Sequence, residues 1–427
     1  MEEWKEYKLG TLTDRKIGYG IVQPGASVSG GVPVIKVNNI ISGLRNVEEL
    51  ETTSKANDAK YSRTKLIGGE LIISVVGTIG KTAIVPMSFA GCNLVRATCL
   101  IDIKDKQLVS WVKYYIDSPQ GQRYIHENLN TTVQPTLNVK SLVDMPIPMY
   151  SSEYMKKAVS ILKSLDDKIE LNKRINENLE QQAQALFKSW FVDFEPFKNG
   201  EFIESELGMI PKGWRVGRYE EIIETTISGD WGKEKPEGNY THKVACIRGC
   251  DFQDIKNGLR GKTPERYILE KNFQTKHFKD KDVLVEISGG TATVSTGRVC
   301  PVSQLLIDKF NEDIVCTNFC RLVRPKPSYG AYLYYSWLYK FNNKVMFGYE
   351  NGTSGIKNFR IKDFTSLEPI VIPSESSLVL FQSMIDKLQI KLQMNGSESQ
   401  KLASLRDTLL PKLMSGELKV NEIENRL

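Results

Sequence analysis

The segment VVGTIGKT at residues 75–82 comes close to the glycine-rich loop with which many enzymes hold nucleotide phosphates. That loop needs a glycine five residues before the glycine of its Gly-Lys pair, and here the position is occupied by Val75. It also needs a helix to follow, so that the helix N-terminus faces the phosphate. The next residues, TAIVPM, contain β-branched side chains and Pro86 and predict a strand instead. The segment therefore predicts two strands joined by a turn with Lys81 exposed at its tip, which suits contact with a nucleic-acid backbone or groove.

The cysteines offer two candidate metal-binding pairs, Cys246 with Cys250 and Cys316 with Cys320. Both pairs lie in strand-like stretches, where residues four apart are separated by about 13 Å. One zinc ion needs its sulfur ligands about 2.3 Å away, so neither pair can close around it. We expect buried free thiols and no metal site.

Asp407, Glu417 and Lys419 are spaced like the metal-binding set of a nuclease. They fall on a predicted helix and its tail, whereas such sets are assembled on strands. The chain has no Asn/Asp-Pro-Pro-aromatic tetrapeptide of a DNA methyltransferase and no credible Ser–His–Asp or Cys–His set. The sequence therefore predicts a binding protein without catalytic residues or a cofactor of its own.

Charge supports a polyanionic partner. The net charge of +6 is modest, but residues 1–150 and residues 201–373 each carry +3, whereas residues 151–200 and 374–427 are neutral. Two mildly basic modules joined by neutral connectors suit contact with DNA at two places. The N-terminal residues lack the apolar stretch of a signal peptide, and the best apolar run, at 71–76, is far too short to cross a membrane, so we expect a cytoplasmic protein.

The chain repeats one plan with a period of about 220 residues, which predicts two β-rich modules of the same fold. Each module contains an aromatic helix, expected at 108–116 and 331–339, whose rings we assign to core packing. The residues between the halves, 194–214, indicate a linker by their Pro, Gly and charge content. Three segments of the first half have similar segments in the second half. They are PVIKVNNI at 33–40 and ACIRGCDF at 245–252, GGELIISVVGTIGK at 68–81 and DKDVLVEISGG at 280–290, and TLNVKSLVDMPIP at 136–148 and NFRIKDFTSLEPIVIP at 358–373.

Each module is followed by a long helix with an apolar seam in alternating steps of three and four residues, typical of coiled-coil packing. Because the two halves are repeats, we expect the two helices to run antiparallel, with Asn172 and Asn395 meeting near mid-length and setting the register of the helix pair. Arg406 interrupts the second seam, and Gly396 weakens its helix. The seams are Met155, Ala158, Leu162, Leu165, Ile169, Asn172, Asn176, Leu179, Ala183, Leu186 and Trp190, and Leu378, Phe381, Ile385, Leu388, Leu392, Asn395, Ser399, Leu402, Arg406, Leu409 and Leu413.

Candidate DNA contacts are polar or basic side chains on turns and strand ends, where they can pair with base edges or phosphates. In the first half they are Lys36, Asn38, Asn39, Thr78, Lys81, Gln134 and Asn138. In the second half they are Arg248, Asp251, Thr291, Thr293, Arg298, Thr353, Lys357 and Arg360.

Over essentially its full length the chain resembles the specificity subunit of a type I restriction–modification system. The resemblance lies in the GTIGK turn, the passage from TTVQPTLN to PIP at 131–148, QALFKSWFVDFEPF at 184–197, ELGMIPKGW at 206–214 and LRDTLLPKLMSGEL at 405–418. The second half lacks a clear GTIGK turn and inserts residues around ATVST.

The resemblance implies an α+β fold: two β-rich target-recognition domains in tandem repeat, separated by two long antiparallel coiled-coil helices. Its domains would be residues 1–150 and 201–373, with the central helix and the start of the linker at 151–200 and the C-terminal helix at 374–427. Each domain would read one half of a bipartite site in double-stranded DNA.

The same resemblance implies that the helices dock two modification subunits, which use S-adenosylmethionine to methylate adenine. It also implies recruitment of restriction subunits, which are motors and nucleases that use ATP and Mg²⁺. Two alternatives remain: a coiled-coil adaptor whose globular ends bind protein, and a metal-dependent nuclease or NTPase.

Overall fold

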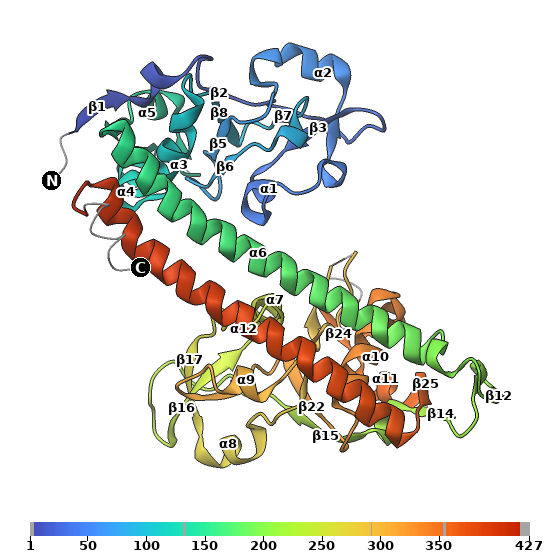
Figure 1. The fold of residues 1–427 in the computed structure, drawn as a ribbon. Coiled ribbons are helices and arrows are strands. Elements are labelled where there is room, and N and C mark those ends of the chain that lie inside the picture. Colours follow the sequence, from blue (N-terminus) through green and yellow to red (C-terminus); the bar gives the residue numbers. More distant parts are fainter. Residues whose placement is uncertain (1–3, 131–133, 292, 353–355, 419–427) are drawn as a thin grey trace. The chain divides into compact units, whose positions relative to one another are not determined.

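The computed structural model describes residues 4–130, 134–291, 293–352 and 356–418. They form two compact units, unit 1 from residues 1–167 with 402–427, and unit 2 from residues 168–401 (Figure 1). The division falls inside both long helices, so each unit holds one module together with a stretch of each helix. Among the described residues no helix is both long and apolar enough to span a membrane.

Unit 1 contains a four-stranded antiparallel sheet and a three-stranded mixed sheet. The first has the order β2-β8-β5-β6, with β2 Gly18–Tyr19, β5 Leu71–Ser74, β6 Thr82–Ile84 and β8 Thr98–Ile101. The second has the order β4-β3-β7, in which β3 and β7 are parallel, with β3 Val32–Ile35, β4 Thr52–Thr53 and β7 Asn93–Leu94. The pairs β1–β11 and β9–β10 complete the unit, with β1 Lys5–Lys8, β9 Leu129–Asn130, β10 Thr136–Leu137 and β11 Pro146–Met149.

Unit 2 repeats the strand order of both larger sheets of unit 1, which confirms the predicted tandem repeat. Its four-stranded sheet has the order β15-β22-β18-β20, with β15 Ile223–Ser228, β18 Val283–Glu286, β20 Val299–Pro301 and β22 Cys320–Pro325. Its mixed sheet has the order β17-β16-β21, with β16 Tyr240–Ile247, β17 Glu265–Leu269 and β21 Asp313–Cys316, and β16 is parallel to β21. The smaller sheets are β14–β25 and β19-β24-β23, with β14 Arg215–Arg218, β19 Ser288–Gly289, β23 Glu350–Asn351, β24 Lys357–Phe359 and β25 Pro369–Ile372.

The aromatic helices pack into the cores, as predicted. Trp111 and Trp337 are fully buried, and their indole nitrogens donate to the carbonyls of Pro148 at 2.8 Å and Gly297 at 3.1 Å. The shorter helices are α1 Val37–Ser42, α2 Lys55–Lys60, α3 Val109–Asp117, α4 Pro119–Glu127, α5 Val139–Val143, α7 Phe252–Lys256, α8 Glu270–Lys276, α9 Gln304–Ile307, α10 Gly330–Asn342 and α11 Ile361–Leu367.

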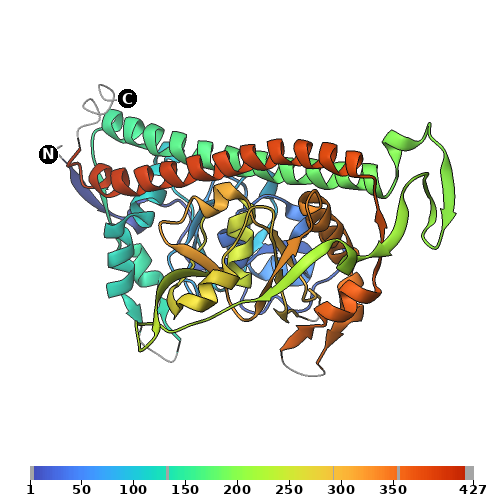
Figure 2. The same ribbon diagram turned by 90° about the horizontal axis from the view of Figure 1, so that it is seen from below.

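The long helices are α6 Ser152–Phe191 and α12 Glu375–Met414, each of 40 residues (Figure 2). In each unit a stretch of α6 packs antiparallel against a stretch of α12, as predicted. In unit 1 the Tyr154 hydroxyl donates to the Leu413 carbonyl at 2.8 Å. Every residue of the two predicted seams is buried or half-buried. Arg406 fits its seam position in unit 1 because it forms an ion pair with Asp166 of α6 at 2.8 Å.

Gly396 does not interrupt α12. A Cβ at this position would lie 2.3 Å from the carbonyl oxygen of Gly258, in the turn after α7. The missing side chain therefore lets that turn approach the helix backbone within unit 2.

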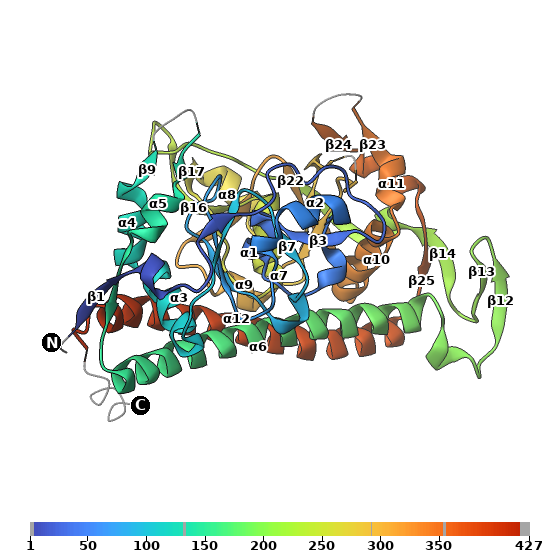
Figure 3. The ribbon, with the colours of Figure 1, turned by 90° about the horizontal axis from the view of Figure 1, so that it is seen from above.

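The segment predicted as a linker instead contains an ordered hairpin, β12 Phe202–Ser205 with β13 Gly208–Pro211 (Figure 3). The linker expectation was wrong here because aromatic packing outweighs the loop-like composition. The Trp214 ring lies 4.7 Å from the ring of Phe197 and 5.8 Å from those of Phe191 and Phe194, measured between centroids, which ties the segment to the end of α6.

Candidate nucleic-acid interface

The glycine-rich turn joins β5 to β6, as the sequence predicted. Its backbone is closed by Ser74, whose hydroxyl donates to the Thr78 carbonyl at 2.6 Å and accepts from the Lys81 amide at 2.9 Å. The Gly80 amide also donates to the Ser74 carbonyl at 2.9 Å. Thr78 and Lys81 are exposed, and in the described part of the chain the Lys81 ammonium makes no ion pair. This turn thus presents a basic group whose charge is not compensated.

The same turn exists in unit 2, although the sequence of unit 2 has no clear GTIGK motif there. Gly297 donates to the Glu286 carbonyl at 2.9 Å, and the Glu286 amide donates to the Arg298 carbonyl at 2.9 Å, which repeats the bonds that Gly80 and Lys81 make to Ser74. Ten residues separate Glu286 from Gly297, whereas five separate the corresponding residues in unit 1. Arg298 is therefore the structural counterpart of Lys81.

The two counterparts differ in their charge environment. Arg298 Nε and Nη2 donate to the two carboxylate oxygens of Glu286 at 2.7 and 2.6 Å, and this hydrogen bonding raises the pKa of Arg298. Because its donors are engaged within the unit, Arg298 is a poorer candidate for DNA contact than Lys81.

The structure places the predicted residues near 134–138 beside the turn of unit 1. Val76 forms an antiparallel bridge with Thr136, and the Leu137 amide donates to the Val75 carbonyl at 3.0 Å. Gln134 and Asn138, which flank this bridge, are both exposed. Four of the seven predicted residues of unit 1, namely Thr78, Lys81, Gln134 and Asn138, therefore lie on two paired segments.

The corresponding segments of unit 2 are β19 and β24, which pair through Ser288 and Asn358. Lys357 Nζ donates to the Thr291 carbonyl at 3.2 Å and forms an ion pair with Glu350 at 2.8 Å. Thr291 and Thr293 are exposed on the adjoining loop, where the Thr291 hydroxyl accepts from the Thr293 amide at 3.2 Å. Thr353, also predicted, lies outside the described residues.

A second recurring feature follows the central strands β3 and β16. Lys36 precedes α1, and its amide donates to the Asn39 side chain at 2.8 Å. Arg248 precedes the turn Gly249–Asp251, and its amide donates to the Asp251 carboxylate at 3.0 Å. Asn39 and Asp251 therefore cap the turns that follow, a structural role that the sequence did not reveal.

The remaining predicted residues of these regions differ in accessibility. Asn38 is exposed on α1, and Lys36 forms a solvent-exposed ion pair with Glu51 at 2.6 Å. Arg248 also donates from its guanidinium to Asp251 at 3.0 Å, and Arg360 pairs with Asp363 at 2.5 Å. Of the basic candidates in unit 2, each is held by a carboxylate within the unit.

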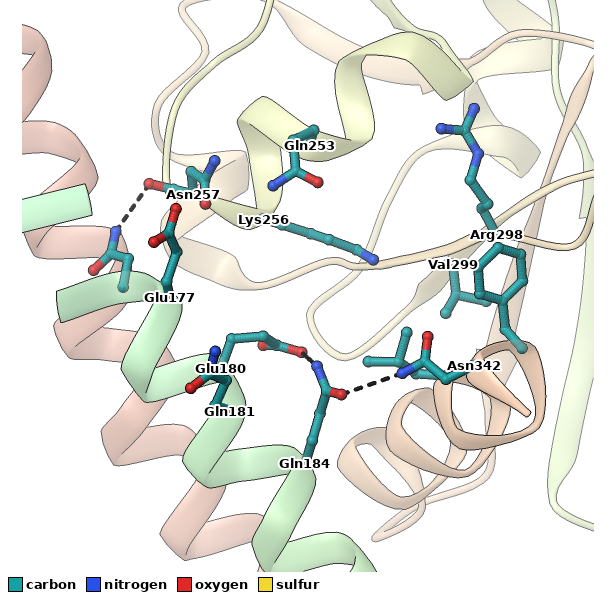
Figure 4. Close-up of a pocket in the computed structure, with 13 residues that line it drawn as sticks. Glu177, Glu180, Gln181, Gln184, Gln253, Lys256, Asn257, Arg298, Val299 and Asn342 are labelled. Carbon is teal, nitrogen blue, oxygen red and sulfur yellow. Dashed lines mark hydrogen bonds between the residues drawn. The ribbon is translucent and has the colours of Figure 1, made fainter. Parts of the chain in front are cut away.

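A polar pocket of about 380 Å³ in unit 2 has no sequence signature (Figure 4). It lies between α6, α7 and α10, and Arg298 is on its wall. Glu180 accepts from Gln184 Nε2 at 3.0 Å, and Gln184 in turn accepts from Asn342 at 3.2 Å. Burial raises the pKa of Glu180 and lowers the pKa of Lys256, whose side chain extends into the pocket.

The paired asparagines lie in unit 2 on facing sides of α6 and α12, and both are buried. Asn172 Nδ2 lies 3.5 Å from the Asn395 carbonyl oxygen, and it donates to Glu398 at 2.7 Å. The side-chain amide of Asn395 donates instead to Asn176, at 2.9 Å.

The described residues contain no cluster of three or more His, Cys, Asp or Glu side chains able to hold a metal ion. All seven cysteines are free, but Cys250 is exposed, so the expectation of buried thiols was wrong for this residue. It lies in the turn Gly249–Asp251 after β16, where its side chain is exposed although both neighbouring residues are buried. Of the nuclease-like set, Asp407 pairs with Arg406 at 2.8 Å, and Lys419 lies outside the described residues.

Comparisons with known proteins agree with this architecture. Residues 1–181 match the family model described as the type I restriction modification DNA specificity domain. The chain is 29% identical to the type I restriction enzyme MjaIX specificity subunit of Methanocaldococcus jannaschii, over 75% of this chain and 71% of that protein. It is 26% identical to the HindI specificity subunit of Haemophilus influenzae, over 98% of this chain and all of the relative. The fold matches the crystal structure of a type I restriction–modification S subunit from M. genitalium, with a TM-score of 0.51, 13% identity and 96% of each chain covered.

Proposed function

We propose that the chain acts as a specificity subunit of a type I restriction–modification system, the proteins to which it is similar, and that each of its two units reads one half of a bipartite sequence in duplex DNA. The observation that carries the proposal is the repetition of one strand order and one backbone turn in both units. Two copies of one scaffold with different exposed side chains suit the reading of two different half-sites.

Within each unit we propose that the turn after β5 or β18 and the segment paired with it face the DNA. Lys81 is the candidate phosphate contact of unit 1, because its charge is exposed and makes no ion pair with any described residue. Thr78, Gln134 and Asn138 are neighbouring exposed groups able to reach base edges or phosphates. The protein's own role is recognition, and the chemistry on DNA belongs to its partners.

We further propose that the long helices dock two modification subunits, which bring S-adenosylmethionine, and that the complex recruits ATP- and Mg²⁺-dependent restriction subunits. Six large apolar side chains on the unit 2 part of these helices are exposed and available to a partner protein. They are Leu171, Val379, Leu380, Met384, Ile390 and Met394.

The deciding experiment is sequencing of methylated adenines in host DNA, with and without the gene for this chain. The proposal expects one two-part motif with a nonspecific spacer that disappears with the gene. Replacing residues 1–150 by the same region of a relative should change one half of the motif only. A single continuous motif, or a change in both halves, would contradict the proposal.

Docking is tested separately by co-purification with the modification subunit. Ile390→Glu and Met394→Glu should reduce the co-purified fraction, because a carboxylate on an apolar interface loses its hydration without a partner. Lys163→Glu, at an exposed and already charged position of α6, is the matched control. Full retention of the partner by both α12 variants would exclude this face.

A further inference from the structure

A pocket of about 440 Å³ opens in unit 2 next to the counterpart of the glycine-rich turn. Its walls include Trp231, Asn318 and Phe319, none of which the sequence singled out. Phe319 is 56% exposed and Trp231 is 36% exposed, although both are large apolar side chains. Two exposed aromatic side chains at one pocket are typical of a site that binds an apolar group of a partner.

The backbone and one ring of this pocket are held in place. The guanidinium of the buried Arg266 lies 3.8 Å from the centre of the Trp231 ring, a stacking contact that fixes the indole. The Phe319 amide donates to the Thr317 hydroxyl at 3.2 Å, and the Phe319 carbonyl accepts from Ile287 at 2.9 Å. The pocket is therefore preorganised, so little conformational entropy is lost when it is filled.

The counterparts in unit 1 occupy the same backbone positions with different side chains. Ala97 corresponds to Phe319, because its carbonyl accepts from Val75 at 2.8 Å in the way that Phe319 accepts from Ile287. By the same alignment Arg96 corresponds to Asn318. Because the scaffold forms with either set, the side chains in unit 2 are not required by the fold.

Among the polar side chains of the pocket, the charged ones are already engaged. Arg248 is bound to Asp251, and Glu286 is bound to Arg298. The Ser288 hydroxyl donates to Asn358 at 2.6 Å. Asn318 is exposed, and its side-chain amide has no hydrogen-bond partner in the described ranges of the chain.

We propose that this pocket reads one A·T base pair of the half-site recognised by unit 2. The Asn318 amide pairs with N6 and N7 of adenine, and the Phe319 ring, which lines the same pocket as Trp231, contacts the 5-methyl group of thymine. A G·C pair is disfavoured, because Arg248, which would pair with guanine, is bound to Asp251, and Glu286, which would accept from cytosine, is bound to Arg298. This inference rests on the proposed function and names the determinant of one position in it.

The test uses the complex of the full chain with its modification subunits and a pool of duplexes randomised across both half-sites. Asn318→Ala and Phe319→Ala should each lower the preference at one A·T position of one half-site by about tenfold or more, and leave the other half-site unchanged. Deoxyuridine in place of that thymine should weaken binding by the wild-type complex but not by the Phe319→Ala complex. Leu305→Ala, at an exposed apolar position of α9, is the matched control and should keep the full preference.

The outcomes separate this inference from the proposed function. If the wild-type complex selects no two-part sequence, both fail. If the wild-type complex selects a two-part sequence, three results overturn only the reading by Asn318 and Phe319. The variants keep every base preference, they lose preference at a G·C pair, or they lose preference in both half-sites. Unchanged melting temperatures of the variants ensure that a lost preference reports recognition rather than unfolding.

Discussion

Asn395 of α12 donates from its side-chain amide to the side-chain oxygen of Asn176 on α6, at 2.9 Å, with both residues buried. Asn176 in turn donates to the carbonyls of Leu392 at 3.1 Å and Asn257 at 3.1 Å. One amide therefore joins both long helices and the turn after α7 within unit 2. The packing of unit 2 against its helix pair depends on this polar contact as well as on apolar burial.

Replacing Asn176 or Asn395 singly by Leu should lower the free energy of unfolding by about 1–3 kcal/mol. Asn176→Leu leaves the buried Asn395 amide without its acceptor, and Asn395→Leu leaves the side-chain oxygen of Asn176 without its donor. The double variant should recover part of that loss, since two leucines can pack together. Urea unfolding of the four proteins gives the coupling energy directly. Asn178→Leu, at an exposed position of α6, serves as the control. Strictly additive losses would show that the two amides are not coupled.

Lys81→Ala should weaken DNA binding similarly for all sequences and reduce the salt slope of log K by about 0.9, the value for one phosphate contact. Arg298→Ala is the matched comparison at the same backbone position of unit 2. Because Arg298 is bound to Glu286, its loss should lower thermal stability and leave the slope unchanged. Binding titrations at several salt concentrations measure both slopes, and equal slopes for wild type and Lys81→Ala would remove Lys81 from the interface.

Gly396→Ala should destabilise the protein, although alanine is the better helix former by about 1 kcal/mol. The added Cβ would lie 2.3 Å from the Gly258 carbonyl oxygen, so the turn after α7 must move away from α12. Ser397→Ala, at the next residue of the helix, lacks that clash and should be neutral or slightly stabilising. Thermal unfolding of the two variants is the measurement, and a higher melting temperature for Gly396→Ala would show that the turn yields without cost.

Because Lys309 is partly buried, we expect the free energy of unfolding to depend on pH. Burial lowers the pKa of Lys309 to about 8, and its ammonium donates to Gln393 Oε1 of α12 at 2.6 Å. Between pH 8 and the ordinary value of 10.5 the unfolded chain holds a proton that the folded chain has lost, so this group's contribution to the free energy of unfolding rises with pH.

The measurement is the difference in free energy of unfolding between wild type and Lys309→Met, which should shift in favour of wild type from pH 8 to pH 10.5. Taking the difference cancels the titration of tyrosines and cysteines that both proteins share. Lys271→Met, at an exposed position of α8, is the control for the loss of a surface ammonium group. A flat difference for Lys309→Met would contradict the lowered pKa.

The sequence predicted the repeat, the turn at Lys81 and both helix seams, because each depends on local patterns of apolar and glycine residues. It predicted that Asn172 and Asn395 meet, and Asn172 Nδ2 does lie 3.5 Å from the Asn395 carbonyl oxygen. It did not predict that the side-chain amide of Asn395 bonds to Asn176, one helical turn further along. A heptad pattern defines which face of a helix is buried, but the axial stagger of two antiparallel helices is set by side-chain packing across them.

Sequence patterns also could not predict the ion pairs that the basic candidate residues of unit 2 form with carboxylates. Arg298 and Glu286 are 12 residues apart and meet only because β18 and β20 pair. Trp231 and Phe319 come together from segments 88 residues apart, and no periodicity links them. Contacts of this kind depend on the tertiary fold alone.

The loop between Glu286 and Gly297 holds ten residues where its counterpart in unit 1 holds five, yet the same backbone bonds anchor both ends. Doubling a flexible loop costs only about 0.6 kcal/mol of closure entropy. Because these backbone hydrogen bonds hold both ends of the loop, segments of different length and composition can be inserted between them without a change in the sheet. A new DNA target can then arise by exchange of a short peptide, a far smaller genetic step than replacement of a whole domain.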